Sequence, residues 1–211
     1  LYADQFHVIL MDFLGNGRSD RVAQFSAELW IEEARQTIAL LEYLAYGKVS
    51  IVGCSGGAWA GVNAGLMRPD LVEKIVADSF DGRTLGENFA ENLRKERENA
   101  KKDPQASGFY QWCQGDDWET VVDMDTAVLI QCARQRAPLF VKPLGELKIP
   151  LLLIGSQEDG MTRKNLKQEY ETIASETGAM IHMFPEGGHP ALYSNAEAAA
   201  VVIRKFLGDK N

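Results

Sequence analysis

The 211-residue chain has few cysteines, few histidines and no long apolar run. Its 3 cysteines, Cys54, Cys113 and Cys132, are odd in number and lack the spacing of metal ligands. This argues against a disulfide framework or a zinc site and favours a reducing, cytoplasmic setting. No stretch approaches the roughly 18 apolar residues of a membrane span. Residues 1–10 also lack the basic start and the small-residue cleavage site of a signal peptide.

Positive charge is scarce as well. Lys and Arg number 22 against 30 Asp and Glu, so the formal net charge is −8 at pH 7. A chain this acidic is not expected to bind nucleic acid or an anionic membrane as its main task. The composition, 45% hydrophobic and 25% charged, is that of an ordinary globular protein, and the length predicts one domain over residues 1–211.

Apolar runs alternate with helical patterns along most of the chain. Residues 27–46 carry apolar side chains at helical spacing, with Ser26 as the expected N-cap and Gly47 just past the end. Further helices are expected at residues 57–67 and 196–208, and strands at residues 6–12, 48–53, 72–79, 149–155 and 179–184. Continuous apolar strands that alternate with helices predict an α/β fold, with a mostly parallel sheet flanked by helices.

Residues 82–146 interrupt this alternation. Three helical patterns and no strand pattern lie within residues 84–145. A helical insertion between two strands of such a sheet is expected to form a lid over the strand ends, where ligands bind. The charged run at residues 93–99 is interpreted as the solvated face of one of these helices.

A glycine-rich turn joins the strand predicted at residues 48–53 to the next helix. It reads Gly53-Cys54-Ser55-Gly56-Gly57, which fits the G-x-S-x-G pattern in its strand-to-helix context. Glycine on either side lets the backbones approach closely, and the strained turn presents the serine hydroxyl. The Gly56 N–H, at the positive end of the helix, can stabilise a developing oxyanion. Ser55 is therefore a candidate nucleophile.

The alternative interpretation is a turn that binds phosphate or only packs. The turn lacks the GxGxxG spacing and the following Lys of phosphate-binding loops, so nucleotide binding is weakly supported. Cys54 is predicted to be a buried neighbour of Ser55 rather than the nucleophile.

A nucleophilic serine needs a base, and the chain offers only 3 histidines. His7 and His182 fall within predicted strands. His189 lies in a glycine-rich loop after the last strand, from which an imidazole can reach the carboxyl edge of the sheet. Glu158 and Asp159 follow the strand at residues 149–155, and either carboxylate can orient the imidazole.

Taken together and in this order, these segments resemble the α/β-hydrolase-fold superfamily of esterase- and lipase-like serine hydrolases with a helical lid. Residues 8–20 resemble its D-x-x-G-x-G-x-S stretch, and residues 52–79 its nucleophile turn, helix and next strand. Residues 149–161 resemble the acid-bearing strand and turn, and residues 184–207 the histidine loop and closing helix. The D-x-x-G-x-G-x-S matches are Asp12, Gly15, Gly17 and Ser19. The resemblance implies Ser55 as nucleophile and His189 as base.

The acid is less well defined by this resemblance. Asp159 is favoured and Glu158 is the second choice, because the spacing after the strand is stretched by one residue. Some members place the acid after the preceding strand, which makes Asp78 and Asp81 outside candidates. Asp12 is expected to fix its own loop.

The family also carries an N-terminal portion whose loop supplies the second oxyanion N–H, and residues 1–5 hold no such loop. We expect about 40–60 residues to precede Leu1 in the natural chain and to contain this donor. A truncated, inactive form is the alternative.

The resemblance implies a hydrolase of small-molecule carboxylic esters that works through an acyl-enzyme and needs no metal or organic cofactor. Peptide or C–C hydrolysis, a ligand-binding protein with little turnover, and a cofactor-free lyase or perhydrolase are the alternatives. Cys54, Trp112 and Trp118 are candidates for the substrate pocket. The lid aromatics Phe109, Tyr110, Trp112 and Trp118 fit equally well as the lid's own core, and Arg83 is expected at the surface.

Overall fold

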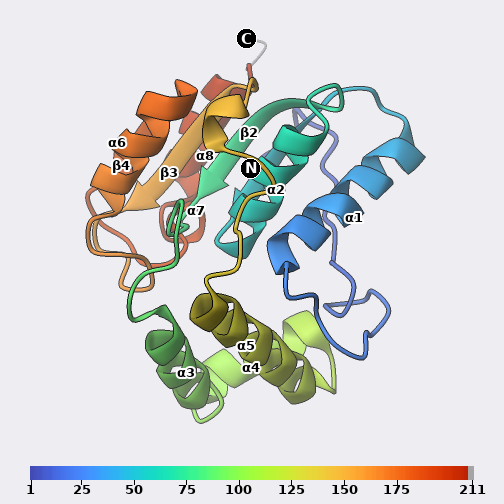
Figure 1. The fold of residues 1–211 in the computed structure, drawn as a ribbon, viewed down its shortest axis with the longest axis vertical. Coiled ribbons are helices and arrows are strands. Elements are labelled where there is room, and N and C mark those ends of the chain that lie inside the picture. The colour runs from blue at the N-terminus through green and yellow to red at the C-terminus, as the bar shows by residue number, and fades with distance from the viewer. Residues whose placement is uncertain (209–211) are drawn as a thin grey trace.

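In the computed structural model, which describes residues 1–208, the chain forms a parallel four-stranded sheet with helices around it (Figure 1). The strands are β1 (Val49–Cys54), β2 (Val72–Asp78), β3 (Leu151–Ser156) and β4 (Met180–Phe184). They lie in the order β1-β2-β3-β4, and every neighbouring pair is parallel. The fold is therefore α/β, as the sequence predicted, and all four strands have their carboxyl ends at the same edge.

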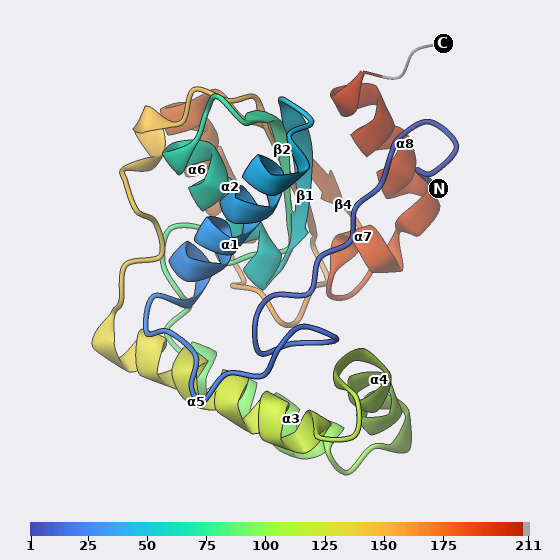
Figure 2. The same ribbon diagram turned by 90° about the vertical axis from the view of Figure 1, so that its right-hand side faces the viewer.

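Helices cover both faces of the sheet (Figure 2). On one face lie α1 (Leu29–Leu44), α2 (Gly56–Met67) and α6 (Leu166–Thr177), and on the other lie the short α7 (Ala191–Ser194) and α8 (Ala196–Leu207). The alternation of side chains along a strand explains this arrangement. In β2, Ile75 packs with α2 and its neighbours, whereas Val76 packs with α8. The central strands β2 and β3 are thus largely buried on both faces, whereas the outer strands β1 and β4 stay partly exposed.

Three helices lie apart from these layers, beyond the carboxyl ends of the strands (Figure 1). They are α3 (Phe89–Ala100), α4 (Pro104–Gln114) and α5 (Trp118–Gln135), and the short η1 (Leu144–Glu146) follows before β3. Asp103 caps α4 by accepting hydrogen bonds from the backbone N–H groups of residues 105 and 106, and Pro104 occupies the first turn. Within residues 1–208, no helix combines the length and apolarity needed to cross a membrane.

The strand predicted at residues 6–12 is wrong. This segment forms no ladder in the described structure, and Val8, Ile9 and Leu10 are exposed, Leu10 by 91%. An apolar run becomes a strand only where a neighbouring backbone pairs with it, and these residues gain no such partner from β1.

Two smaller differences concern helices. The first helix begins at Leu29 rather than 27, with Glu28 at the N-cap, so Ser26 does not cap it. The Ser26 hydroxyl instead accepts a hydrogen bond from the Glu28 N–H at 3.1 Å, which fixes the preceding turn. Helix α6 was not among the predicted elements.

Candidate active site

Ser55 occupies the sharp turn between β1 and α2. Its backbone has φ 51° and ψ −120°, a conformation that side-chain-bearing residues rarely adopt. A Cβ on Gly53 would overlap the backbone carbonyl of Gly57, so glycine is required at position 53. A Cβ on Gly57 would meet nothing within 4 Å. The expectation that both glycines serve close approach therefore holds for Gly53 and is wrong for Gly57.

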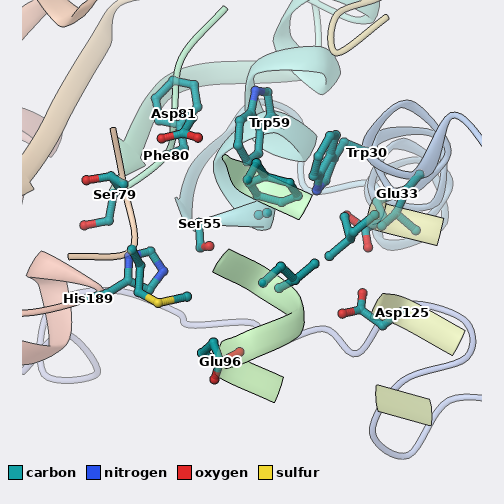
Figure 3. A pocket seen from close by; sticks show the side chains of 18 of the residues that line it. Trp30, Glu33, Ser55, Trp59, Ser79, Phe80, Asp81, Glu96, Asp125 and His189 are labelled. Carbon is teal, nitrogen blue, oxygen red and sulfur yellow. The ribbon is translucent and has the colours of Figure 1, made fainter. Parts of the chain in front are cut away.

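The N-terminus of α2 lies directly after Ser55. Gly56 is the first residue of the helix, where backbone N–H groups have no acceptor within the helix. These N–H groups and the helix dipole favour negative charge at this end. Figure 3 shows the Ser55 hydroxyl beside a cavity that the His189 ring also borders.

His189 is paired with a buried carboxylate. Its Nδ1 lies 2.8 Å from Oδ2 of Asp159, whose side chain is fully buried. The other oxygen of Asp159 accepts a hydrogen bond from the Met161 N–H at 2.9 Å. A carboxylate held in this way fixes the orientation of the imidazole and favours a proton on Nδ1, which leaves Nε2 as the basic nitrogen. Glu158 is exposed and makes no such contact in the described structure.

The outside candidates for the acid are engaged elsewhere. Asp78, buried at the end of β2, accepts hydrogen bonds from the Leu192 N–H at 3.0 Å and the Ser79 hydroxyl at 3.1 Å. Burial raises the pKa of Asp78. Asp81 accepts hydrogen bonds from the backbone N–H groups of residues 163 and 86, at 2.7 and 2.9 Å. Both carboxylates therefore fasten loops around the site. Asp12 does the same for its own loop through the Arg18 N–H.

The cavity beside Ser55 has a volume of about 370 Å³ and lies between the strand ends and helices α1, α3, α4 and α5. Its wall near Ser55 is aromatic: Trp30 and Trp59 stack at 4.4 Å, and Phe80 meets Trp59 edge to face at 5.2 Å. The helices around the cavity also add charged and polar side chains to its wall. These lining residues are Glu33, Glu96, Arg97, Tyr110 and Asp125.

The three residues predicted to line the substrate pocket are not among the described lining residues. Trp112 is 82% exposed, on the outer surface of α4. Trp118 stacks on Tyr110 at 6.0 Å and belongs to the packing between α4 and α5. The Cys54 thiol points to Asp78, 3.5 Å from its Oδ2, and burial raises the pKa of Cys54 to about 12. A thiol with such a pKa stays protonated, so Cys54 is a poor nucleophile.

Arg83 pairs with Glu169 at 2.9 Å and with Glu176 at 2.9 Å. It lies outside the described cavity lining, in agreement with its expected surface role.

Sequence reasoning missed the contribution of α1 to the cavity. Trp30 and Glu33 are buried on this helix and line the cavity, and Asp125 reaches it from α5. The available signal was the position of Glu33, four residues after Leu29 and three after Trp30, which places a carboxylate within the apolar face.

The sheet, the strained serine turn and the histidine–carboxylate pair define an α/β protein of the hydrolase type. A family model described as the alpha/beta hydrolase family matches residues 1–202. The chain therefore belongs to the α/β-hydrolase family. A search of curated proteins by sequence finds no match.

Solved structures share the fold. NosK from Streptomyces actuosus is similar with a TM-score of 0.78 and 18% identity, over 97% of this chain and 86% of that chain. A lipase-esterase related protein from Clostridium acetobutylicum has a TM-score of 0.73 and 21% identity, over 97% and 85% of the two chains. A thermophilic esterase from Thermogutta terrifontis has a TM-score of 0.68 and 19% identity, over 97% and 80%. At these identities the likeness concerns the fold alone.

Proposed function

We propose that the protein is a serine hydrolase of small-molecule carboxylic esters, with Ser55 as nucleophile, His189 as base and Asp159 as the orienting acid. The observation that carries this proposal is the 2.8 Å contact between His189 and the buried Asp159, at a cavity bordered by the strained Ser55. Nucleophile, acid and base follow one another in the chain order of α/β-hydrolases.

In the proposed reaction, Nε2 of His189 removes the proton from the Ser55 hydroxyl as its oxygen attacks the ester carbonyl carbon. The carbonyl oxygen becomes an oxyanion that the Gly56 N–H stabilises. The histidine then donates the proton to the departing alcohol, and an acyl group remains on Ser55. Water activated by the same histidine releases the acid and restores the serine.

A second hydrogen-bond donor near Gly56 belongs to α1. The indole Nε1 of Trp30 lies 3.0 Å from the position that a Cβ on Gly56 would occupy, and among the described residues it has no acceptor. This N–H supports binding of a carbonyl oxygen near Ser55. The donor predicted upstream of Leu1 stays a prediction.

The substrate class rests on the cavity wall and on the relatives. The aromatic wall beside Ser55 suits the apolar acyl part of an ester, and α3, α4 and α5 would act as the lid over it. Two of the similar structures are named as an esterase and a lipase-esterase related protein. The three free cysteines support a reducing compartment such as the cytoplasm.

The test is labelling with a fluorophosphonate, which reacts with activated serines, read by intact mass. We expect one adduct on the natural protein, none on Ser55→Ala, and one on Ser175→Ala, a matched change at an exposed serine of α6. An unlabelled natural protein, or a labelled Ser55→Ala variant, would contradict the assignment of the nucleophile.

Labelling is followed by turnover of a panel of p-nitrophenyl esters. An adduct on Ser55 without ester turnover would favour the binding-protein alternative. Product analysis then separates ester hydrolysis from lyase or perhydrolase chemistry.

A further inference from the structure

Glu33 is a buried carboxyl group without a partner. It is 9% exposed, lines the cavity from α1, and its side-chain oxygens accept no hydrogen bond or ion pair from the described residues. Figure 3 shows Glu33 and Asp125 at the side of the cavity away from His189, with Ser55 between. Buried carboxyls are normally paired, so a group left unpaired and open to a cavity points to a ligand.

The other charged groups that α3 and α5 add to the cavity lining contact one another. Arg97, the one cation among the described lining residues, contacts Asp125 at 3.3 Å through Nη2 and Glu96 at 3.3 Å through Nε, and its Nη1 bonds the Tyr110 hydroxyl. Arg97 makes no ion pair with Glu33 in the described structure, and its buried Nε donates no hydrogen bond. Glu33, Asp125 and Glu96, the carboxyl groups that α1, α5 and α3 add to the lining, outnumber this one guanidinium.

We propose that Glu33 and Asp125 form a subsite for a cationic ammonium group at the end of an apolar chain. The proposal rests on the proposed function, because the chain would be the acyl part of an ester bound at Ser55. An anionic group is disfavoured, since it would lie near the carboxyl groups of Glu96 and Asp125 and would gain no ion pair from Glu33. An alkyl end would leave Glu33 buried without a hydrogen bond.

The path between Ser55 and this subsite is apolar. Trp30 and Trp59 stack along it, and Leu93 and Leu129 add to the lining from the lid helices. A linear alkyl chain fits such a wall, whereas a second polar group midway would have few partners. The substrate class inferred is thus an ester of an ω-amino acid with an apolar chain.

Release of a proton from Glu33 on binding would be a second, independent readout of contact between Glu33 and an ammonium group. Burial, with Asp125 nearby, raises the pKa of Glu33 to about 8, so at pH 7 the group is mostly protonated. The charged and titratable groups around it are Asp125 on α5, Arg97 and Glu96 on α3, and Tyr110 on α4. An ammonium ion bound against Glu33 favours its ionised form, and its binding at pH 7 therefore releases a proton.

The experiment compares n-hexylammonium with 1-hexanol by isothermal titration calorimetry at pH 7, in two buffers of different ionisation enthalpy. The two probes have the same chain and differ in the charged head group. We expect hexylammonium to bind the natural protein at least about tenfold more tightly, with release of up to about one proton. Glu33→Gln is expected to remove both the preference and the proton release, whereas the exposed matched change Glu158→Gln preserves them.

Equal binding of the two probes to the natural protein would overturn the proposal, as would a preference that survives in Glu33→Gln. If Glu33→Gln does not fold, the proposal is still tested on the natural protein, by the relative affinity of the two probes and by the number of protons released on binding. The fluorophosphonate adduct on Ser55 is measured on the same samples. If the protein is labelled on Ser55 but shows no preference for the amine, only the subsite proposal is contradicted. If it prefers the amine but is not labelled, only the hydrolase proposal is contradicted.

With turnover established, p-nitrophenyl 6-aminohexanoate and heptanoate form the matched substrate pair. The natural protein is expected to favour the amino ester in kcat/KM by about tenfold, and Glu33→Gln the heptanoate.

Discussion

Asp159 and Glu158 are neighbours in the chain, but only the Asp159 carboxylate is buried and lies against His189. The difference arises because the turn after β3 points the Glu158 side chain into solvent and the next side chain, Asp159, inward. Asp159 is also held by the Met161 N–H, so it meets the imidazole in a single orientation. A charged acceptor in this position stabilises the imidazolium that forms when Ser55 loses its proton.

Asp159→Asn is expected to lower kcat by about 10³-fold or more while KM changes little, because an amide can no longer favour the proton on Nδ1 of His189. The measurement is steady-state turnover of a p-nitrophenyl ester over a pH series. Glu158→Gln, the matched change one residue earlier, is expected to leave kcat within about twofold. The reverse ranking of the two variants would assign the acid to Glu158.

At the scale of elements, the turn between β1 and α2 is a fixed unit. The Gly53 backbone packs against the Gly57 carbonyl, so the end of the strand and the first turn of the helix lie in direct contact. The strained backbone of Ser55 persists because the elements on both sides hold it.

Gly53→Ala is expected to lower the free energy of unfolding by several kcal/mol, since its Cβ overlaps backbone atoms that cannot move aside. Gly57→Ala places its Cβ in open space within the first turn of a helix and is expected to change stability by about 1 kcal/mol or less. Urea unfolding of both variants checks the contrast. Equal losses would mean that both positions need glycine.

Secondary-structure elements could be predicted from the sequence where a local pattern determines them. The strands at residues 48–53, 72–79, 149–155 and 179–184 could be predicted because each is a short apolar run bounded by turn residues. Residues 6–12 carry the same apolar signal but gain no backbone partner, and sequence patterns cannot report pairing.

Some residues of the candidate site could be predicted from the sequence, and others could not. The serine turn has a local signature and was found, and the position of His189 after the last strand followed from the order of elements. The cavity wall was not found, because Trp30, Glu33 and Asp125 meet only after α1 and α5 pack over the strand ends. The sequence instead favours Trp112, which is exposed, since aromatic composition does not reveal which way a lid helix is turned.

For the whole molecule, buried carboxyl groups make stability depend on pH. Burial raises the pKa of Glu33, Asp78 and Asp125, so the folded protein holds these protons at a pH where the unfolded chain has lost them. The free energy of unfolding therefore falls as pH rises through this window. For Glu33 the window runs from the ordinary value of 4.5 to about 8. Each such group contributes a slope of up to about 1.4 kcal/mol per pH unit.

Glu33→Gln removes one of these groups and keeps its size. The variant is expected to gain stability relative to the natural protein as pH rises from 5 to 8, by a few kcal/mol in total, because the natural protein alone must keep Glu33 protonated or bury its charge. Urea unfolding at pH 5, 6.5 and 8 measures the difference.

The amide that replaces the Glu33 carboxyl is itself unpaired and lowers the free energy of unfolding by the same amount at all three pH values. The change of the difference with pH therefore reports only the titration of Glu33. A difference for Glu33→Gln that stays flat with pH would mean that Glu33 titrates at its ordinary value. Hexylammonium, which favours ionised Glu33, is then expected to stabilise the natural protein more at pH 8 than at pH 5, and this links the stability of the whole molecule to the occupancy of its cavity.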